Sequence, residues 1–571
     1  MADVANITGS ADANLHIAKG ERIYIESSYK YAEDAAEVLA KATGLSHTAS
    51  WSDKRDYYGL SLFRKPRFSW SLPLMTNGQP LAIESASLGG WSEPARRALD
   101  LTHAMQPSTI PSTAEWEQMW AAWDTLSLHI IPADKLLDKP IDLRHPFIFY
   151  LGHLPVFADI HMAAAEQAPL TEPRQYAVWF ERGIDPNLEN PEICHAHSEV
   201  PDQWPQVAEI LAYRDRVRDR VRSWVTRFHA GELAPVSASA ARHVWMAFEH
   251  DAMHTETMLY MVLQMTPGSM NPPLKSSFAP LSAMSKSLKP AESWLRFTGG
   301  SNITMGLLAD NEESLASSTL PDGHIFGWDN ESPSTVKFVD SFKVSSHPVT
   351  NSQYLEFLLS QPADEFEALV PKSWISLDND DFGVRTVHGA PSITTTVAAL
   401  WPVFVSQCQA SKYAELKGKR LPTEAEWSYA SRTYHMSRAL NETASTKASG
   451  SLSVDDYLRS RVPPDQLRKA LAHPYDAFAP TSANIGFAHW HPVPSVQGYS
   501  DGMGGACFVG NGWEWTSTPF RPFEGFKASP MYPGYSADFF DPPETAENDS
   551  THYVVKGGSY ATHQRIALRQ T

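Results

Sequence analysis

The sequence predicts an α+β protein built from a four-helix bundle and a following irregular domain. Three observations support this fold class. The chain has 571 residues, enough for about three or four domains of typical size. Between residues 113 and 265, apolar residues recur at the intervals expected of amphipathic helices. From residue 291 onward the pattern changes to short strands separated by many glycines, prolines, tryptophans and asparagines.

The bulk composition argues against several classes of partner. The formal net charge is −18, so the chain lacks the basic surface that binds nucleic acids and anionic membranes. The N-terminus is polar without an apolar signal core, and no run of about 18 apolar residues predicts a membrane span. The three cysteines, Cys194, Cys408 and Cys507, are few and far apart, as expected for packed thiols in the reducing cytoplasm.

The N-terminal part of the chain predicts only the edge of a larger α/β domain. After a polar start, the sequence indicates a strand at 22–26, a helix at 32–42 and a second strand at 58–63. These elements are too few to bury a core alone. Residues 67–112 contain many Pro, Ser and Gly residues, so we interpret them as a linker with one helical piece at 92–105.

Four helices are predicted within residues 113–275, which we assign to one bundle. They span residues 114–131, 146–165, 204–228 and 240–264. Val217, Val221 and Val225 recur at four-residue steps and mark an apolar stripe on the third helix. Metal sites in such bundles are built from inward side chains on facing helices. The irregular domain takes residues 291–571.

The fourth helix carries a pair of histidines with metal-ligand spacing. His250 and His254 are four residues apart, so both imidazoles lie on one face of the helix and can reach the same ion. The metalloprotease pattern places a general-base Glu directly after the first histidine. Asp251 stands there instead, which weakens a protease interpretation. Glu256 follows two residues after the pair, either supporting a ligand or capping a surface.

A third ligand must come from a facing helix, and His153 on the second helix is the best candidate. A single histidine among apolar residues is usually a hydrogen-bonded core residue, and only the paired histidines favour a ligand here. Three neutral imidazoles suit Fe(II), Zn(II), Cu(II) or Ni(II). Other histidines are weaker candidates for the third ligand: His145, His161, His195, His197 and His243.

These motifs together resemble a known family. His153 on one helix and the His250-x-x-x-His254-x-Glu256 pattern on another resemble the DinB-like half of the ergothioneine-forming sulfoxide synthases. The later domain resembles the formylglycine-generating-enzyme-like fold, which is C-type-lectin-like. Three segments carry this second resemblance: 510–516 (GNGWEWT), 419–427 (KRLPTEAEW) and 348–354 (PVTNSQY). In such domains these Trp- and Gly-rich segments hold loops together, and we expect that structural role here.

The N-terminal residues 1–66 resemble the last part of a histidine methyltransferase. Glu26-Ser27-Ser28 matches the Glu-x-Ser with which those enzymes hold the imidazole of histidine. The glycine-rich half that binds S-adenosylmethionine is not in this sequence, so we expect no methyl transfer by this chain. A methyltransferase before the synthase is the order of the fungal bifunctional ergothioneine enzymes. The chain therefore resembles such an enzyme with the methyltransferase mostly missing.

The resemblance implies a metal-dependent oxidation as the reaction of this chain. Members of the family bind Fe(II) through three histidines, here His153, His250 and His254. They use dioxygen to join cysteine to hercynine, giving hercynylcysteine sulfoxide. Cysteine or γ-glutamylcysteine can be the thiol, and the fungal resemblance favours cysteine. Two alternatives stay open: a non-catalytic remnant that binds metal or hercynine, and a metal-dependent thiol transferase or hydrolase that needs no dioxygen. The oligomeric state is not predicted.

The resemblance also assigns roles outside the metal ligands. Tyr532 matches the tyrosine that donates a proton at the iron site, and Tyr535 matches one that lines the hercynine pocket. Met253 stands where bacterial members carry a glutamine that touches hercynine, so we expect that contact to be lost or replaced. The family continues beyond the position of Thr571 with a substrate-contacting segment and a closing strand. We therefore expect a C-terminus that is cut short and a pocket that is incomplete.

Overall fold

The computed structural model describes most of the chain from residue 110 onward and a few segments before it. The chain divides into two compact units, Met1–Ser69 and Trp70–Thr571. The described residues are 46–52, 59–64, 75–76, 79–80, 110–141, 144–180, 185–186, 194–195, 201, 203–233, 235–266, 268–271, 294–307, 326–378, 381–442, 453–472, 483–494, 508–532, 535–542, 545 and 550–569.

The described residues of the first unit form an antiparallel strand pair. β1 (Ser46–Ser52) pairs with β2 (Gly59–Arg64), with an irregularity between His47 and Ala49. The strand predicted at 58–63 is confirmed as β2, whereas β1 was not predicted. The expected strand at 22–26, the expected helix at 32–42 and the Glu26-Ser27-Ser28 segment lie outside the described residues, as does the helical piece at 92–105. In the linker, β3 (Met75–Thr76) pairs with β4 (Gln79–Pro80).

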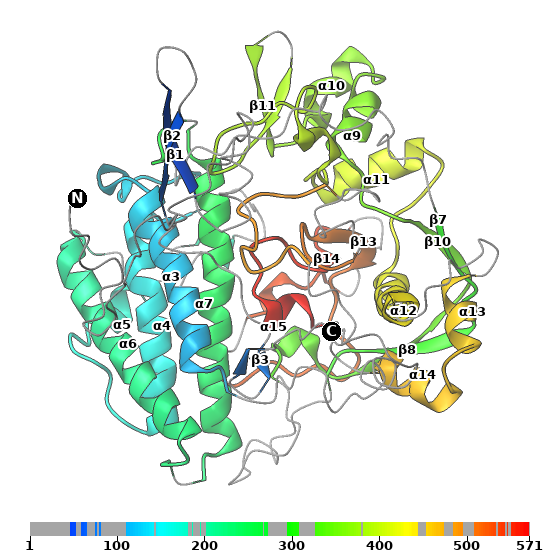
Figure 1. Cartoon of the computed structure of the whole chain (residues 1–571). Coiled ribbons are helices and arrows are strands. Elements are labelled where there is room, and N and C mark those ends of the chain that lie inside the picture. Colours follow the sequence, from blue (N-terminus) through cyan, green and yellow to red (C-terminus); the bar gives the residue numbers. More distant parts are fainter. Residues whose placement is uncertain are drawn as a thin grey trace, which may run out of the picture. The chain divides into compact units, whose positions relative to one another are not determined.

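The four predicted bundle helices are all present, with ends that differ from the predicted ones by a few residues (Figure 1). They are α3 (Thr113–Asp124, which runs on into the π-helical turn η1 at Thr125–Ile130), α4 (Phe147–Glu166), α6 (Val207–His229) and α7 (Ala238–Gln264). Four shorter elements connect them: η2 (Ala133–Lys135), α5 (Tyr176–Trp179), β5 (Asp185–Pro186) and β6 (Cys194–His195).

Side-chain patterning explains how the bundle packs. α4 packs against both α6 and α7. Val217, Val221 and Val225 on α6 are all buried, which confirms the predicted apolar stripe. The side chain of Ser237 caps α7 by accepting a hydrogen bond from the Ala240 N–H at 3.1 Å. No Pro or Gly interrupts α7, so it runs unbroken through both histidines of the pair.

α4 is apolar on nearly all sides, and most of its residues are therefore buried between the other helices of the bundle. Among the described helices, it alone is long and apolar enough to cross a membrane by length and composition. However, 89% of its most apolar stretch is buried inside the protein. A helix that is apolar all round belongs in a protein core as readily as in a membrane. Its Asp159 is tied to α6 by an ion pair with Arg220, at 2.8 Å.

The C-terminal domain contains short strands and helices joined by long loops, as predicted. Among its described residues, the strands form four antiparallel pairs: β7 (Trp294–Phe297) with β10 (Phe342–Ser345), β8 (Ser301–Met305) with β9 (Thr335–Val339), β11 (Trp374–Ser376) with β12 (Phe382–Val384), and β13 (Glu514–Pro519) with β14 (Tyr553–Lys556). Its helices are α9 (Asn351–Leu358), α10 (Ala363–Leu369), α11 (Gln407–Leu416), α12 (Glu424–Glu442), α13 (Val454–Arg459), α14 (Pro464–Ala472) and α15 (Gln564–Ala567), with the 3₁₀ turns η5 (Asp329–Glu331), η7 (Val397–Leu400) and η8 (Ala537–Phe539).

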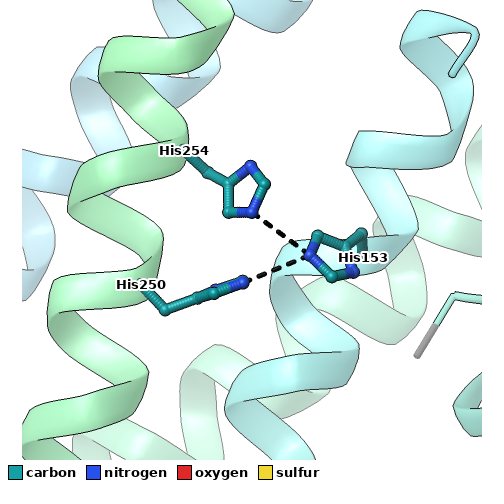
Figure 2. A group of neighbouring side chains, drawn as sticks. All are labelled: His153, His250 and His254. Atoms are coloured by element: carbon teal, nitrogen blue, oxygen red, sulfur yellow. Dashed lines mark hydrogen bonds between the residues drawn. The ribbon is translucent and has the colours of Figure 1, made fainter. Parts of the chain in front are cut away.

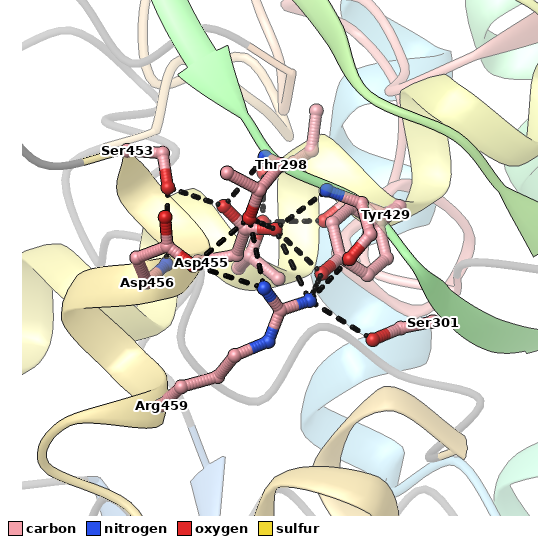
Figure 3. A network of polar contacts seen from close by, with 10 residues as sticks. Thr298, Ser301, Tyr429, Ser453, Asp455, Asp456 and Arg459 are labelled. Atoms are coloured by element: carbon pink, nitrogen blue, oxygen red, sulfur yellow. Dashed lines mark hydrogen bonds and ion pairs between the residues drawn. The ribbon is translucent and has the colours of Figure 1, made fainter.

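Buried polar groups fix the loops of this domain. Asp455, at the start of α13, accepts hydrogen bonds from the backbone N–H groups of Thr298 (3.0 Å) and Gly299 (2.9 Å) and from the Tyr429 hydroxyl (3.0 Å) (Figure 3). Gly299 has a φ of +61°, and a Cβ there would lie 2.3 Å from the Asp340 carbonyl oxygen. The turn between β7 and β8 therefore requires glycine at this position and a buried carboxylate beside it.

The Trp- and Gly-rich motifs also hold loops together, which confirms their expected structural role. Glu514 accepts a hydrogen bond from the Trp427 indole N–H at 2.8 Å and thereby joins β13 to α12. The Trp515 indole N–H donates to the Val405 carbonyl oxygen at 2.9 Å. Each bond connects segments far apart in the sequence, so the motifs connect the loops that surround them.

Candidate metal centre

The three predicted ligands meet between α4 and α7. Nε2 of His153 lies 3.2 Å from Nε2 of His250 and 3.3 Å from Nε2 of His254 (Figure 2). The three ligand atoms all lie within 4.8 Å of one another. The two histidines of α7 face α4 because their four-residue spacing places both rings on one side of the helix. Among the described residues, this is the single group of three or more His, Cys, Asp or Glu side chains arranged to hold a metal ion.

A backbone carbonyl fixes the tautomer of His153. Nδ1 of His153 lies 2.7 Å from the carbonyl oxygen of Phe180, and a carbonyl can only accept. Nδ1 therefore carries the proton, and Nε2 of the neutral ring presents its lone pair to the other two histidines. Gly152 makes this contact possible, because a Cβ there would lie 2.6 Å from the Phe180 ring. Neither Phe180 nor Gly152 was predicted, since their roles depend on a contact between distant segments.

Burial keeps the three imidazoles neutral. Burial lowers the pKa of His153 to about 4, although the bond to the Phe180 carbonyl opposes the shift. Burial lowers the pKa of His250 well below its ordinary value, and the neighbouring rings of His254 and His153 lower it further. The pKa of His254 is likewise well below its ordinary value because of burial and the nearby His153. A metal ligand must be the unprotonated imidazole, so the site is prepared for a cation at neutral pH.

The arrangement fits a transition-metal ion. Imidazole nitrogens bonded to one metal at about 2.1 Å stand about 3.0–3.4 Å apart at right-angle or tetrahedral positions. The two Nε2 separations from His153, 3.2 and 3.3 Å, lie in this range, and all three ligand atoms lie within 4.8 Å of one another. Within the described part of the chain, the buried Nδ1 atoms of His250 and His254 have no hydrogen-bond partner. Their remaining ring nitrogens, Nε2, are the atoms that point at His153. Three neutral nitrogens match the donor sets of Fe(II), Zn(II), Cu(II) and Ni(II).

Aromatic rings pack against the ligand histidines. The Phe157 ring stacks on His250 with centroids 3.6 Å apart and an interplanar angle of 10°. The Phe149 ring stacks on His153 at 5.2 Å. Tyr532, the predicted proton donor, packs edge-on against Phe157 with centroids 5.6 Å apart. The structure thus brings the tyrosine from the C-terminal domain to the ring that covers one ligand.

The two predicted hercynine-pocket residues contact each other. The Tyr535 hydroxyl donates a hydrogen bond to the Met253 sulfur at 3.5 Å, and Trp328 stacks on the Tyr535 ring at 4.2 Å. Burial raises the pKa of Tyr535, so its phenol stays protonated. Met253, Trp328 and Tyr535 line a cavity of about 910 Å³ between α7 and the C-terminal domain. Glu331 and Arg569 supply charged groups to its wall.

Two glutamates of α7 hold the C-terminal domain against the bundle. Glu249 is buried in a bidentate ion pair with Arg569, with both N···O distances 2.7 Å, and it accepts the Trp328 indole N–H at 3.0 Å. Glu256 is also buried. Its three donors from the other domain are the Trp513 indole N–H (2.8 Å) and the hydroxyls of Ser559 (2.6 Å) and Thr562 (2.8 Å). Glu256 was predicted either to support a ligand or to cap a surface. It is buried, and the hydrogen bonds described for it go to residues other than the ligand histidines, so it fits neither predicted role.

The remaining histidine candidates lie elsewhere. His161 and His243 pair with each other through their Nδ1 atoms at 2.8 Å, and His145 packs on Phe149 at 4.2 Å. The side chain of His195 and all of His197 lie outside the described residues.

The expectation of packed thiols is wrong for Cys408, which is exposed and free near the start of α11. That position lies on a solvent-facing turn of a short surface helix, so the residue type alone did not determine its burial. The side chain of Cys194 and all of Cys507 lie outside the described residues.

Three family models match successive parts of the chain. Residues 283–571 match the sulfatase-modifying factor enzyme 1-like domain. Residues 113–258 match the DinB superfamily. Residues 2–65 match the histidine-specific, S-adenosylmethionine-dependent methyltransferases. The three-histidine group lies in the second of these regions, and Tyr532 and Tyr535 lie in the first.

Curated relatives match most of this chain. Ergothioneine biosynthesis protein 1 of Neurospora crassa is 33% identical over 96% of this chain and 62% of its own length. The Schizosaccharomyces pombe protein of the same name is 30% identical over 82% of this chain and 54% of its own length. Hercynine oxygenase of Mycolicibacterium smegmatis is 29% identical over 55% of this chain and 64% of its own length. The chain thus spans a little over half the length of these relatives.

Proposed function

The chain belongs to the sulfatase-modifying factor enzyme 1-like family, and from this premise we propose that it is a non-haem Fe(II)- and dioxygen-dependent sulfoxide synthase. Its reaction joins cysteine to hercynine and oxidises the sulfur, giving hercynylcysteine sulfoxide in ergothioneine biosynthesis. The names of the relatives support this proposal, since two are ergothioneine biosynthesis proteins and one is a hercynine oxygenase. A cytoplasmic location belongs to the same proposal.

One observation supports the proposal most directly: three neutral imidazoles, two buried and that of His254 half-buried, meet within 4.8 Å of one another. His153, His250 and His254 would hold the iron. When bound, iron supplies a site for dioxygen chemistry and positions for the thiol and imidazole of the two substrates. The aromatic rings of Phe149 and Phe157 would cover one face of His153 and one face of His250 beside that site.

Residues of the C-terminal domain would complete the site. We assign Tyr532 as the proton donor, because its ring packs on Phe157 directly beside a ligand. Met253 and Tyr535 would hold hercynine in the larger cavity. The thioether of Met253 cannot donate a hydrogen bond, so it offers an apolar contact where a glutamine would offer an amide. The Tyr535 hydroxyl is directed at this sulfur, which fixes the methionine side chain.

The test is coupled oxygen consumption. The full chain is loaded with Fe(II) without oxygen, and uptake is then followed after adding hercynine, cysteine and oxygenated buffer. We expect uptake and hercynylcysteine sulfoxide, identified by mass spectrometry, only when iron and both substrates are present. A fully iron-loaded chain that consumes no oxygen contradicts the proposal. Thiol turnover without oxygen would instead support the thiol transferase or hydrolase alternative. γ-Glutamylcysteine in place of cysteine identifies the preferred thiol.

A further inference from the structure

A second cavity lies inside the C-terminal domain, and none of the three ligand histidines lines it. Its volume is about 460 Å³, which is within the size range of small-molecule sites. All the residues that line it belong to the C-terminal domain, chiefly to β10, α11 and the segment Gly510–Trp515. Trp513 and Trp515 line both cavities, so they form a shared wall. None of the residues assigned to the proposed reaction lines this second cavity.

The interior of the second cavity is apolar and aromatic. Its walls include Phe342, Val349, Phe404, Tyr413 and Trp513. Binding an apolar ligand against such a surface is favourable by roughly 25 cal/mol for each Å² of apolar area removed from water. Aromatic walls also favour ring-shaped or extended apolar groups, which can stack on them.

Three lysines stand at the border of this cavity: Lys343, Lys417 and Lys419. All three are exposed. The Lys419 ammonium lies 5.0 Å from the centroid of the Trp294 ring, and Lys417 lies 5.9 Å from that of Tyr413. These contacts hold the charges over the aromatic surface. Within the described part of the chain, none of the three forms an ion pair.

The two glutamates that line the second cavity are already neutralised or hydrogen-bonded. Glu426 forms two bonds with the Arg420 guanidinium, at 2.6 and 2.7 Å. Glu514 accepts hydrogen bonds from the Trp427 indole and the Phe508 backbone N–H. The lysines therefore leave an unbalanced positive charge at this border, although the chain as a whole has a net charge of −18. An anion would complement that charge.

A buried imidazole also lines the second cavity without a full set of partners. Only 6% of the surface of His347 is exposed, and its Nδ1 donates to the Pro348 carbonyl oxygen at 2.9 Å. The buried Nε2 atom has no hydrogen-bond partner among the described residues. In the neutral ring this Nε2 is an acceptor, and buried acceptors are normally satisfied. A ligand N–H or O–H is one group that can satisfy it.

We propose that the second cavity binds an amphipathic anion. Its ligand is a small molecule with an aromatic or aliphatic body, held by the apolar walls, and one carboxylate, sulfonate or phosphate group, held by the lysines. This inference stands apart from the proposed sulfoxide synthase activity, because the cavity shares no ligand histidine and no proposed substrate residue with it. If the cavity does not bind such an anion, the proposed sulfoxide synthase activity still stands, and the reverse also holds.

The probe for the test is 1-anilinonaphthalene-8-sulfonate, an aromatic anion that fluoresces when bound in an apolar site. Titration of the full chain should give saturable binding at one site. Reversing two charges in Lys417→Glu/Lys419→Glu should weaken that binding about tenfold or more, because two attractive charges become repulsive. Both lysines are exposed, so the variant should fold as the parent does. The matched control is Lys337→Glu, an exposed lysine that lines the larger cavity.

Two further measurements make the result decisive. N-phenyl-1-naphthylamine has the same rings without the sulfonate, so it should bind more weakly and ignore the lysine reversal. Ala410→Phe places an aromatic ring in the second cavity, takes up part of its volume and should weaken the binding of both probes. Thermal unfolding confirms that each variant is folded, since loosened proteins also bind such dyes. Equal binding by the parent, the lysine variant and Ala410→Phe would overturn the proposal, and so would weaker binding in Lys337→Glu alone.

Discussion

The bundle and the C-terminal domain are held together by different interactions. In the bundle, apolar stripes such as Val217, Val221 and Val225 set the packing, and the three ligand histidines are neutral. In the C-terminal domain and at its border, buried charges such as Asp455 and Arg569 fix the loops. The two regions therefore contribute different parts: the bundle supplies a preformed cluster of three imidazole nitrogens, and the C-terminal domain supplies loops that are positioned by hydrogen bonds. Tyr532 and Tyr535, the residues proposed for proton donation and hercynine binding, both come from those loops.

Removing a ligand should have the largest effect. In His153→Ala, we expect iron content after loading to fall from about one ion per chain to nearly none, since two imidazoles on one helix leave the site open. Metal analysis of the desalted protein measures this. The matched control is His243→Ala, which removes another bundle histidine that lies outside the cluster and should keep the iron. Unchanged iron in His153→Ala would remove this residue from the site.

Breaking the buried ion pair at the domain border should be the next largest effect. Arg569→Ala leaves the Glu249 carboxylate buried without its partner, which should cost about 3–5 kcal/mol of unfolding free energy. Denaturant unfolding measures the change. The matched control is Arg222→Ala, which breaks an exposed ion pair with Glu117 and should cost less than about 1 kcal/mol. Similar losses in the two variants would show that buried charges are not what holds the C-terminal domain in place.

Changing the proposed proton donor should affect turnover but not metal binding. Tyr532→Phe keeps the ring on Phe157 and removes the hydroxyl, so sulfoxide formation should slow by about a hundredfold. Part of the remaining oxygen use should go to oxidation of cysteine alone. Product analysis by mass spectrometry measures both quantities, and the iron content of the same variant is the control. A rate and product ratio equal to those of the parent would exclude Tyr532 from the chemistry.

Acid should weaken the bundle through its buried histidines. Burial lowers the pKa of His161 to about 3, with a further contribution from His243. Below pH 6.5 the unfolded chain binds a proton at this residue and the folded chain does not, so stability is lost as the pH falls from 6.5 toward 3. The slope is up to about 1.4 kcal/mol per pH unit for each such histidine.

Replacing this histidine tests the sign and source of the effect. In His161→Phe, the unfolding free energy measured in urea should fall less between pH 7 and pH 5 than in the parent. The two proteins are compared at matched ionic strength, without metal. The same fall in both would mean that groups elsewhere, including those of the C-terminal domain, determine the acid sensitivity.

The sequence predicted the part of the site that depends on local spacing. His250 and His254 were identified from one helical turn, and His153 followed from the facing helix that a bundle requires. The partners that orient these residues were not predicted. Phe180 is 27 residues from His153, and Arg569 is 320 residues from Glu249. No periodic pattern encodes such pairs, because they depend on how loops return to the bundle. The boundaries of the bundle helices, by contrast, were predicted to within a few residues.

Gly152 has a consequence for how this protein tolerates mutation. It has no side chain that could bind a metal, yet a Cβ at this position would collide with the Phe180 ring at 2.6 Å. The ring that would have to move belongs to the residue whose carbonyl orients His153. A saturation scan scored by metal content would therefore record this glycine as nearly as intolerant as the histidine beside it. The set of positions that the three-histidine group requires is therefore larger than the set of its proposed ligands.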